Sequence, residues 1–254
     1  MNWIALDLSI LGPALLAGVL VIATHVPLGQ RVLERGIIFL DLAVAQVAGL
    51  GIIAAYSFNW QPGGWQAQAV AFSAAILSVL FLDFSERRWP QIQEALIGSL
   101  FVLASSGGIL LLSKNPHGGE QLKDLLVGQI LWVNYTQLLP VAVLYAIVLG
   151  LWFGRRQPVG HLQFYLSFAL AITASVQLVG IYLVFASLIL PALAIRRIRQ
   201  HALAYGYALG LIAYVLGLVM SVMLDMPAGG VIVYALCVLA VILARFVKHK
   251  TVAH

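Results

Sequence analysis

Long runs of apolar residues, separated by short polar linkers, fill most of the chain. Most of the runs have about the 20 residues that an α-helix needs to cross the hydrocarbon core of a bilayer. Because hydrocarbon offers the backbone no water as a hydrogen-bond partner, such runs form helices. The pattern therefore predicts an all-α polytopic membrane protein, a single domain over residues 1–254 with eight or nine transmembrane helices. The apolar runs cover residues 10–29, 37–57, 66–83, 95–113, 138–154, 162–177, 178–195, 203–223 and 229–247.

The runs over 162–177 and 178–195 are nearly continuous, so they form either one long bent helix or a hairpin that turns near Val179 and Gly180. Basic residues separate these alternatives, because Lys and Arg gather on the cytoplasmic side of membrane proteins. With a hairpin and an external N-terminus, 12 of the 14 Lys and Arg lie inside. The sequence therefore predicts a hairpin and a cytoplasmic C-terminus in the inner (plasma) membrane. These basic residues are Arg31, Arg35, Arg87, Arg88, Arg155, Arg156, Arg196, Arg197, Arg199, Arg245, Lys248 and Lys250.

The linker over 114–137 contains a segment, Glu120 to Val133, that begins polar and becomes apolar. It is too short to cross a bilayer, and it predicts a short or re-entrant helix on the outer side, which is tolerated where it packs against protein. His117 and Glu120 stand at its start. They are candidates for an outer entrance that meets a cation, and the alternative is a pair of solvated loop residues.

Composition agrees with a membrane environment. Hydrophobic residues make up 62% of the chain, charged residues 9%, and the mean hydropathy is +1.00. A soluble domain has about a quarter of its residues charged, so this chain could not cover a soluble surface. The net charge of +5 does not indicate a nucleic-acid partner, because the basic residues flank apolar runs. Cys237 is the only cysteine, which excludes a disulfide or a thiolate metal site within one chain.

Sequence signatures of catalysis are missing. The chain has no G-x-S-x-G, no H-E-x-x-H, no C-x-x-C and no phosphate-binding loop that ends in Lys-Ser or Lys-Thr. We therefore expect neither catalytic residues nor a covalently bound cofactor. Any ATP-driven process would require a separate ATPase.

Polar residues inside the predicted spans are candidates for function, because ionisable groups in a membrane are costly. Asp41 lies in the second span, and Gln46 follows five positions later, about 140° around the helix. Gln177 lies in a later span. Asp41 either lines a path for an ion or pairs with Arg35 or a neighbouring helix. Gln46 and Gln177 either line the same path or join helices by hydrogen bonds.

The other histidines suggest less. His25, His161, His201, His249 and His254 fall at predicted cytoplasmic ends of spans, in linkers or in the tail. We expect solvated or interfacial imidazoles at all five positions.

Residues 191–199 combine a proline that ends an apolar span with a basic amphipathic stretch. The pattern predicts a helix at the cytoplasmic face. Such a helix either flanks the span, as basic residues commonly do, or docks in a groove of a cytoplasmic partner with Ile195 and Ile198 as anchors.

Four short motifs occur in a fixed order along the chain. They are Ala45-Gln46-Val-Ala-Gly-Leu-Gly51, Leu126-Val-Gly128-Gln-Ile-Leu131, Val179-Gly180 followed by an apolar stretch and Pro191-Ala192-Leu-Ala-Ile-Arg196-Arg197, and Asp225-Met-Pro-Ala-Gly229. With these motifs, the chain resembles the permease subunits of bacterial zinc and manganese ABC importers through most of its length.

The resemblance implies a function and a set of partners. It implies a permease that moves a divalent metal ion, zinc or manganese, into the cytoplasm. The implied partners are a second copy of the permease, a cytoplasmic ATPase dimer and an extracytoplasmic metal-binding protein, all around a lipid bilayer. The segment that would couple the permease to the ATPase contains Pro191, Ala192, Ile195, Arg196, Arg197 and Ile198.

One departure from the family pattern concerns the metal. The family has Gly-Asp-x-x-x-His in the second span, and this chain has Leu42 and Gln46 where that Asp and His belong. Asp41 is offset by one position, about 100° around the helix. Zinc sites normally use imidazole or thiolate, whereas oxygen ligands suit harder cations. The identity of the metal therefore stays open.

Three alternative functions remain. A permease for a metal chelate (siderophore, haem or cobalamin) fits the loss of the Asp/His pair, although the chain is short for it. An ion-coupled secondary transporter should have inverted halves and several charges inside the membrane, and the sequence has neither. An intramembrane enzyme would need a catalytic partner for Asp41.

Overall fold

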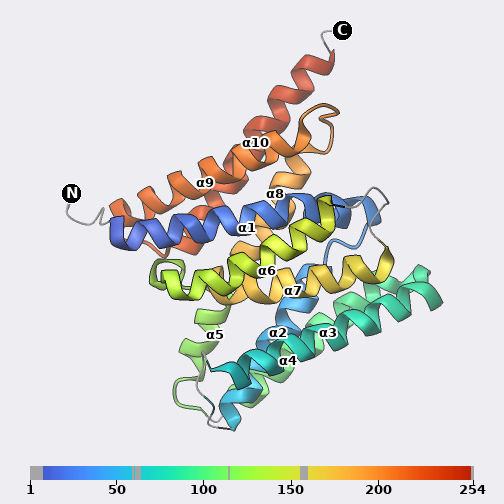
Figure 1. Cartoon of the computed structure of the whole chain (residues 1–254), viewed down its shortest axis with the longest axis vertical. Coiled ribbons are helices and arrows are strands. Elements are labelled where there is room, and N and C mark those ends of the chain that lie inside the picture. Colours follow the sequence, from blue (N-terminus) through green and yellow to red (C-terminus); the bar gives the residue numbers. More distant parts are fainter. Residues whose placement is uncertain (1–7, 59, 61–63, 114, 155–159, 253–254) are drawn as a thin grey trace. The chain divides into compact units, whose positions relative to one another are not determined.

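The computed structural model describes residues 8–58, 60, 64–113, 115–154 and 160–252, and these form helices joined by short turns (Figure 1). The predicted basic residues Arg155 and Arg156 and the histidine His254 lie outside the described residues. The helices are α1 (Leu8–Arg35), α2 (Leu40–Ser57), α3 (Trp65–Arg88), η2 (Pro90–Ile92), α4 (Gln93–Leu112), α5 (Gly118–Val127), η3 (Ile130–Trp132), α6 (Tyr135–Phe153), α7 (His161–Val179), α8 (Ile181–Ile195), α9 (Ala202–Leu224) and α10 (Ala228–Val252).

Nine apolar helices correspond to the nine predicted apolar runs. Within the described ranges, seven helices are long and apolar enough to cross a membrane, and α2 and α8 are shorter apolar helices. Gly180, with φ +79°, separates α7 from α8, so the predicted break near Val179 and Gly180 is present. The predicted short helix at 120–133 is two pieces, α5 and η3, because the chain breaks at Gly128 with φ +72°. The predicted all-α membrane fold is confirmed.

The chain forms two compact units, each assembled from discontinuous segments. The first unit comprises Met1–Gly36, Val127–Tyr145 and Leu178–His254, and the second comprises Ile37–Leu126 and Ala146–Gln177. The chain therefore passes from the second unit to the first after Leu126 and again after Gln177.

In the first unit, α8 is the central helix and packs against α1, α9 and α10. Most of its side chains are buried, as expected for a helix that is apolar on every side. Next to it, α1 and α9 run side by side in opposite directions (Figure 1). Small residues permit these close contacts: a Cβ at Gly206 would lie 2.7 Å from Val26. Helices in membranes commonly pack through such small residues.

In the second unit, α2 packs between α3 and α4. Glycines again bring the helices together. A Cβ at Gly51 would lie 3.0 Å from the Cα of Ala71 on α3, and one at Gly108 on α4 would lie 3.1 Å from Ile53. This packing positions α2, which carries Asp41 and Gln46.

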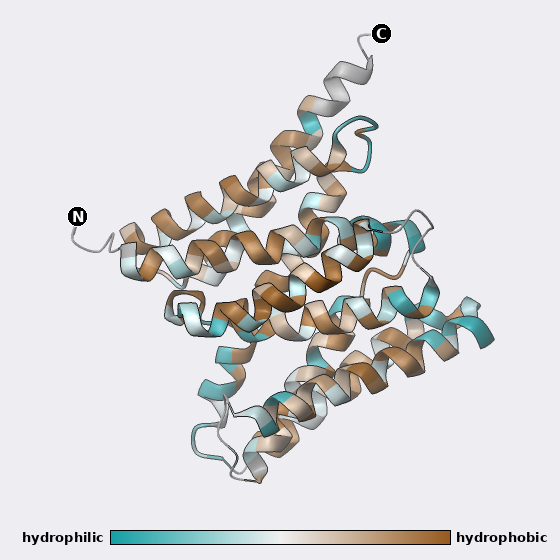
Figure 2. Cartoon of the chain, in the orientation of Figure 1, coloured by the Kyte–Doolittle hydropathy of each residue, from teal (hydrophilic) through white to brown (hydrophobic). Residues whose placement is uncertain are grey.

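The outward faces of several helices are apolar. Leu103 and Leu110 on α4 and Leu139 on α6 are each about 70% exposed, with values of 70%, 72% and 68%. Hydrophobic residues also cover much of α9 and α10, whereas hydrophilic residues gather on α5 and in the turn between α8 and α9 (Figure 2). Soluble monomers rarely expose apolar surface on this scale, so these faces are suited to lipid or to another membrane protein.

Candidate functional site

Asp41 is a buried carboxylate without a partner. It lies in the first turn of α2 and is 0% exposed. Neither of its carboxylate oxygens accepts a hydrogen bond from any part of the chain that the structure describes. Among the described residues, the predicted alternative, an ion pair of Asp41 with Arg35 or a neighbouring helix, is therefore not formed. Because burial of an uncompensated charge is costly, a cation next to Asp41 would lower the free energy of this carboxylate.

The two glutamines occupy different surroundings. Gln46 lies further along α2 and is half-buried. Gln177 on α7 accepts a hydrogen bond from the side-chain amide of Gln68 on α3 and donates one to the carbonyl of Thr173 at 3.3 Å. No hydrogen bond joins Gln177 to Asp41 or Gln46 among the described residues. Gln177 therefore acts in this structure as a link between α3 and α7.

His117 and Glu120 stand together at the start of α5. The Nδ1 atom of His117 lies 3.5 Å from a carboxylate oxygen of Glu120, and the two side chains are 77% and 83% exposed. A pair this exposed contributes little stability. It leaves a carboxylate and an imidazole open to solvent, and their role as an outer entrance stays a prediction.

The segment predicted to couple with a partner differs from the expected basic helix. Pro191 lies inside α8, which continues to Ile195, and residues 196–201 form turns and bends. Ala192 and Ile195 are buried within the first unit, so Ile195 is not an anchor for a partner, contrary to the prediction.

The reason for the difference is packing. A Cβ at Gly206 on α9 would lie 3.0 Å from Ile195, which shows how closely this side chain is enclosed. Ile198 remains half-buried, and Arg196, Arg197 and Arg199 are exposed. The surface offered to a partner is therefore a basic turn at the end of α8.

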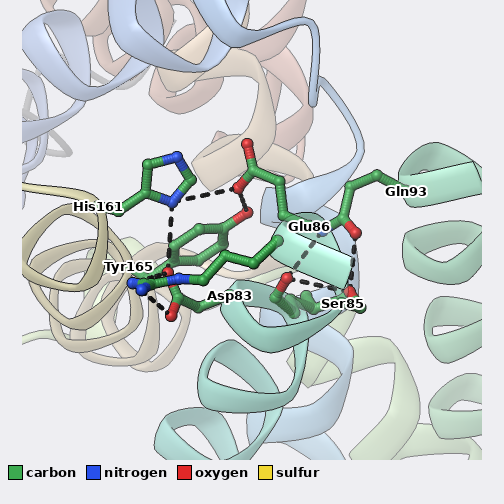
Figure 3. A network of polar contacts seen from close by, with 8 residues as sticks. Asp83, Ser85, Glu86, Gln93, His161 and Tyr165 are labelled. Carbon is green, nitrogen blue, oxygen red and sulfur yellow. Dashed lines mark hydrogen bonds and ion pairs between the residues drawn. The ribbon is translucent and has the colours of Figure 1, made fainter. Parts of the chain in front are cut away.

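A polar network that the sequence did not predict joins α3 to α7 (Figure 3). Nδ1 of His161 lies 3.3 Å from a carboxylate oxygen of Asp83 and 3.6 Å from one of Glu86. The Tyr165 hydroxyl donates a hydrogen bond of 2.5 Å to Glu86. Arg87 adds an ion pair of 3.0 Å with Asp83. His161, expected as a solvated imidazole, is thus partly enclosed by two carboxylates.

The same end of α3 is joined to α4. The Ser85 hydroxyl lies 2.7 Å from the side-chain oxygen of Gln93, whose amide donates to the carbonyl of Leu82 at 3.0 Å (Figure 3). The acidic residues are visible in the sequence, but their partners lie up to 79 positions away. Across the described residues, no group of three or more His, Cys, Asp or Glu has the arrangement of a metal site. The contacts of the network join α3 to α7 and to α4.

His25 is another buried polar residue with an unpaired atom, and its prediction as a solvated or interfacial imidazole was wrong. It is 0% exposed in α1. Its Nδ1 atom lies 3.0 Å from the Thr24 hydroxyl, and Nε2 has no hydrogen-bond partner among the described residues. The local sequence around a single histidine near the end of a span does not indicate whether its ring is buried or interfacial.

The model of the ABC 3 transport family matches residues 7–247, nearly the whole chain. The chain belongs to this family. An uncharacterized membrane protein of Synechocystis sp. is 26% identical to this ABC 3 family member over 251 residues, which cover 90% of this chain and 88% of that protein. A probable metal transport system membrane protein of Chlamydia trachomatis is 23% identical over 253 residues, with 89% and 82% covered.

A solved structure has the same fold as this ABC 3 family member. The structure of PsaBC from Streptococcus pneumoniae in complex with Fab matches with a TM-score of 0.78 at 20% identity, covering 98% of this chain and 100% of the matched chain. The predicted class, a permease subunit of an ABC transporter, is confirmed. It is a membrane-spanning subunit of a transport family.

Proposed function

We propose that this permease moves a divalent metal ion of the manganese or zinc class into the cytoplasm, driven by ATP hydrolysis in a separate chain. The observation that carries the proposal is Asp41, a fully buried carboxylate with no hydrogen-bond partner in the part of the chain that the structure describes. Intramembrane acids of this kind mark ion pathways. A cation that passes Asp41 would supply the positive charge that compensates this carboxylate.

The donor atoms on α2 favour the harder end of this class. Asp41 offers carboxylate oxygens, which suit manganese better than zinc. The position that would give an imidazole in the family pattern is Gln46. We therefore expect manganese as the preferred cargo.

The partners follow from the family and from the basic turn. A second copy of the permease, a dimer of cytoplasmic ATPase subunits and an extracytoplasmic metal-binding protein would complete the transporter. The exposed Arg196, Arg197 and Arg199 at the end of α8 would contact the ATPase, which places this end of α8 in the cytoplasm. The N-terminus then lies outside and the C-terminus inside the plasma membrane.

Energy transfer would run through α8. The ATPase can shift the permease between outward-facing and inward-facing states only as far as its contacts with the two states differ in free energy. The basic turn lies at the end of a helix that is buried against α1, α9 and α10. Movement of this turn therefore moves the centre of the first unit.

A permease for a metal chelate is the second candidate. The absence of an Asp/His pair with family spacing favours it, because a chelated metal needs no protein ligands in the path.

Uptake assays separate the two candidates. A strain that lacks this chain and its ATPase would be complemented with both, and uptake of manganese, zinc, iron and cobalt salts would be measured beside the same metals presented as chelates. We expect rapid uptake of free Mn²⁺ that depends on the ATPase. Uptake restricted to chelates would favour the second candidate, and uptake without the ATPase would contradict both.

A further inference from the structure

Three glycines from distant parts of the chain meet within the first unit. Gly128 lies between α5 and η3, Gly180 lies between α7 and α8, and Gly229 is in the first turn of α10. A Cβ at Gly180 would lie 2.6 Å from the Cα of Gly128, and one at Gly128 would lie 2.5 Å from the backbone nitrogen of Gly180. A Cβ at Gly229 would collide with the carbonyl of Val127. Backbone thus packs directly on backbone at this glycine junction.

The backbone conformations also require glycine at two of the three positions. Gly180 has φ +79° and ψ 162°, a region that is essentially restricted to glycine. Gly128 has φ +72°, which glycine adopts without steric cost. The junction therefore excludes side chains both by contact and by conformation.

These glycines belong to three of the four short motifs that the chain shares with the permease family. Gly128 is in Leu126-Val-Gly128, Gly180 is in Val179-Gly180, and Gly229 ends Asp225-Met-Pro-Ala-Gly229. Separate in the sequence, the three motifs form one contact in space. The transport function described so far uses none of these residues.

The junction also has a distinctive place in the chain. It lies at the first residue of α8, whereas Arg196 and the basic turn lie at the other end, roughly 22 Å away for a helix of 15 residues. The chain changes from the second unit to the first after Leu126 and after Gln177, within three residues of Gly128 and Gly180. The break at Gly180 makes α8 a separate helix, whose first backbone hydrogen bond runs from Val184 to Gly180 at 3.1 Å.

We propose that Gly128, Gly180 and Gly229 form the fixed pivot about which α8 tilts during transport. The inference rests on the proposed function, in which the ATPase moves the basic turn. A contact made only of backbone has no rotamers to rearrange, so it stays in place while side chains along α8 repack. Displacement at Arg196 then becomes a tilt of α8 instead of a shift along its length. The glycines are positioning residues, because they act on the path through α8.

Distances between spin labels test the pivot directly. In a chain with Cys237→Ser, one label pair would use Trp132→Cys and Tyr182→Cys beside the junction, and a second would use Arg199→Cys and Phe246→Cys at the far ends of α8 and α10. All four side chains are exposed. Both pairs would be measured in the complex with the ATPase, without nucleotide and with ATP bound to a hydrolysis-deficient ATPase.

We expect the far pair to shift by more than about 2 Å, the scale of helix shifts in switching proteins, and the junction pair to stay constant. An equal change of both label distances would overturn the proposal. An unchanged distance between the far labels on addition of ATP would also overturn it. This measurement needs no transported ion. If the unaltered chain transports no metal, the proposed function fails, while the labels still decide whether the pivot exists.

Two neighbouring glycines provide a matched pair of variants. Gly229→Ala adds a methyl group against Val127, whereas Gly230→Ala adds the same group where no atom lies within 4 Å. At equal amounts of folded protein, we expect Gly229→Ala to lose Mn²⁺ uptake several-fold relative to Gly230→Ala while ATP hydrolysis continues. Equal uptake per folded molecule would overturn the proposal, including the case in which Gly229→Ala only lowers the yield of folded protein.

Discussion

The hydroxyl of Tyr165 on α7 donates a hydrogen bond of 2.5 Å to the carboxylate of Glu86 on α3, across 79 positions of sequence. Tyr165 is 0% exposed, and Glu86 also lies 3.6 Å from His161 (Figure 3). The bond therefore joins two helices of the second unit through a buried tyrosine and a partly buried carboxylate. This contact predicts a stability effect that is separate from transport.

Removal of this hydroxyl should destabilise the protein. Tyr165→Phe leaves a carboxylate without one of its donors, which typically costs about 1–3 kcal/mol. We expect a lower temperature of thermal unfolding in detergent. Tyr182→Phe, on α8 and 54% exposed, is the matched control and should melt like the unaltered protein. Equal melting of the two variants would mean that the Tyr165 bond contributes nothing.

The distribution of basic residues predicts the topology. Reporter fusions placed after Arg156 and after Arg199 should both give cytoplasmic signals, because Lys and Arg concentrate on that side. A fusion after Trp60 should give an external signal. An external signal after either arginine would contradict the predicted hairpin and the assignment of the basic turn to the cytoplasm.

Charge reversal in the basic turn should uncouple transport from ATP hydrolysis. Arg196→Glu with Arg197→Glu places acids where the ATPase is proposed to bind, and both side chains are exposed, so folding and insertion should not change. We expect uptake to fall sharply while the amount of permease in the membrane stays constant. Arg88→Glu, at the exposed end of α3, controls for a general effect of charge. Unchanged uptake and ATPase activity would reduce the turn to a topological anchor.

The fold could be predicted from the sequence because the bilayer leaves few choices. A chain with apolar runs of this length must form helices, so the nine runs gave nine helices, and Gly180 marked the break between α7 and α8. At Ile195, the local sequence pattern led to a wrong prediction. Its amphipathic surroundings suggested an anchor for a partner, but contact with α9 across Gly206 buries it.

The candidate site was less predictable, because its properties depend on contacts between distant segments. Asp41 could be singled out as an acid inside a span, but the sequence does not show that the described residues leave its carboxylate without a hydrogen-bond partner, because this depends on packing. From the sequence, Gln177 could be either a path residue or a link between helices, and in the structure it accepts a hydrogen bond from Gln68 on another helix. His25 and His161 were both expected to be solvated or interfacial, but His25 is buried and His161 lies beside two carboxylates.

Restoring the family spacing on α2 should change the metal preference. Leu42→Asp with Gln46→His places a carboxylate and an imidazole at i and i+4, which share one helix face. Both positions are half-buried, so the side chains have room. Because zinc favours imidazole, the ratio of zinc to manganese uptake should rise. An unchanged ratio, at normal expression, would indicate that this face of α2 does not contact the ion.

The charge of Asp41 can be removed with almost no change of shape. Asp41→Asn should slow ATP-driven Mn²⁺ uptake into vesicles that contain permease, ATPase and binding protein by about tenfold or more, which corresponds to a loss of about 1.4 kcal/mol. Gln46→Ala should have a smaller effect, because it removes no charge. Glu34→Gln removes an exposed charge at the end of α1 and should have none.

The central claim is that Asp41 interacts with the transported cation and does not stabilise the fold. The most direct test measures both the uptake rate and the unfolding temperature of Asp41→Asn on the same preparation. Because the variant removes a buried charge that has no hydrogen-bond partner among the described residues, we expect slower uptake together with an unchanged or higher unfolding temperature. Normal uptake, or a loss of uptake that only follows a loss of folded protein, would contradict the account.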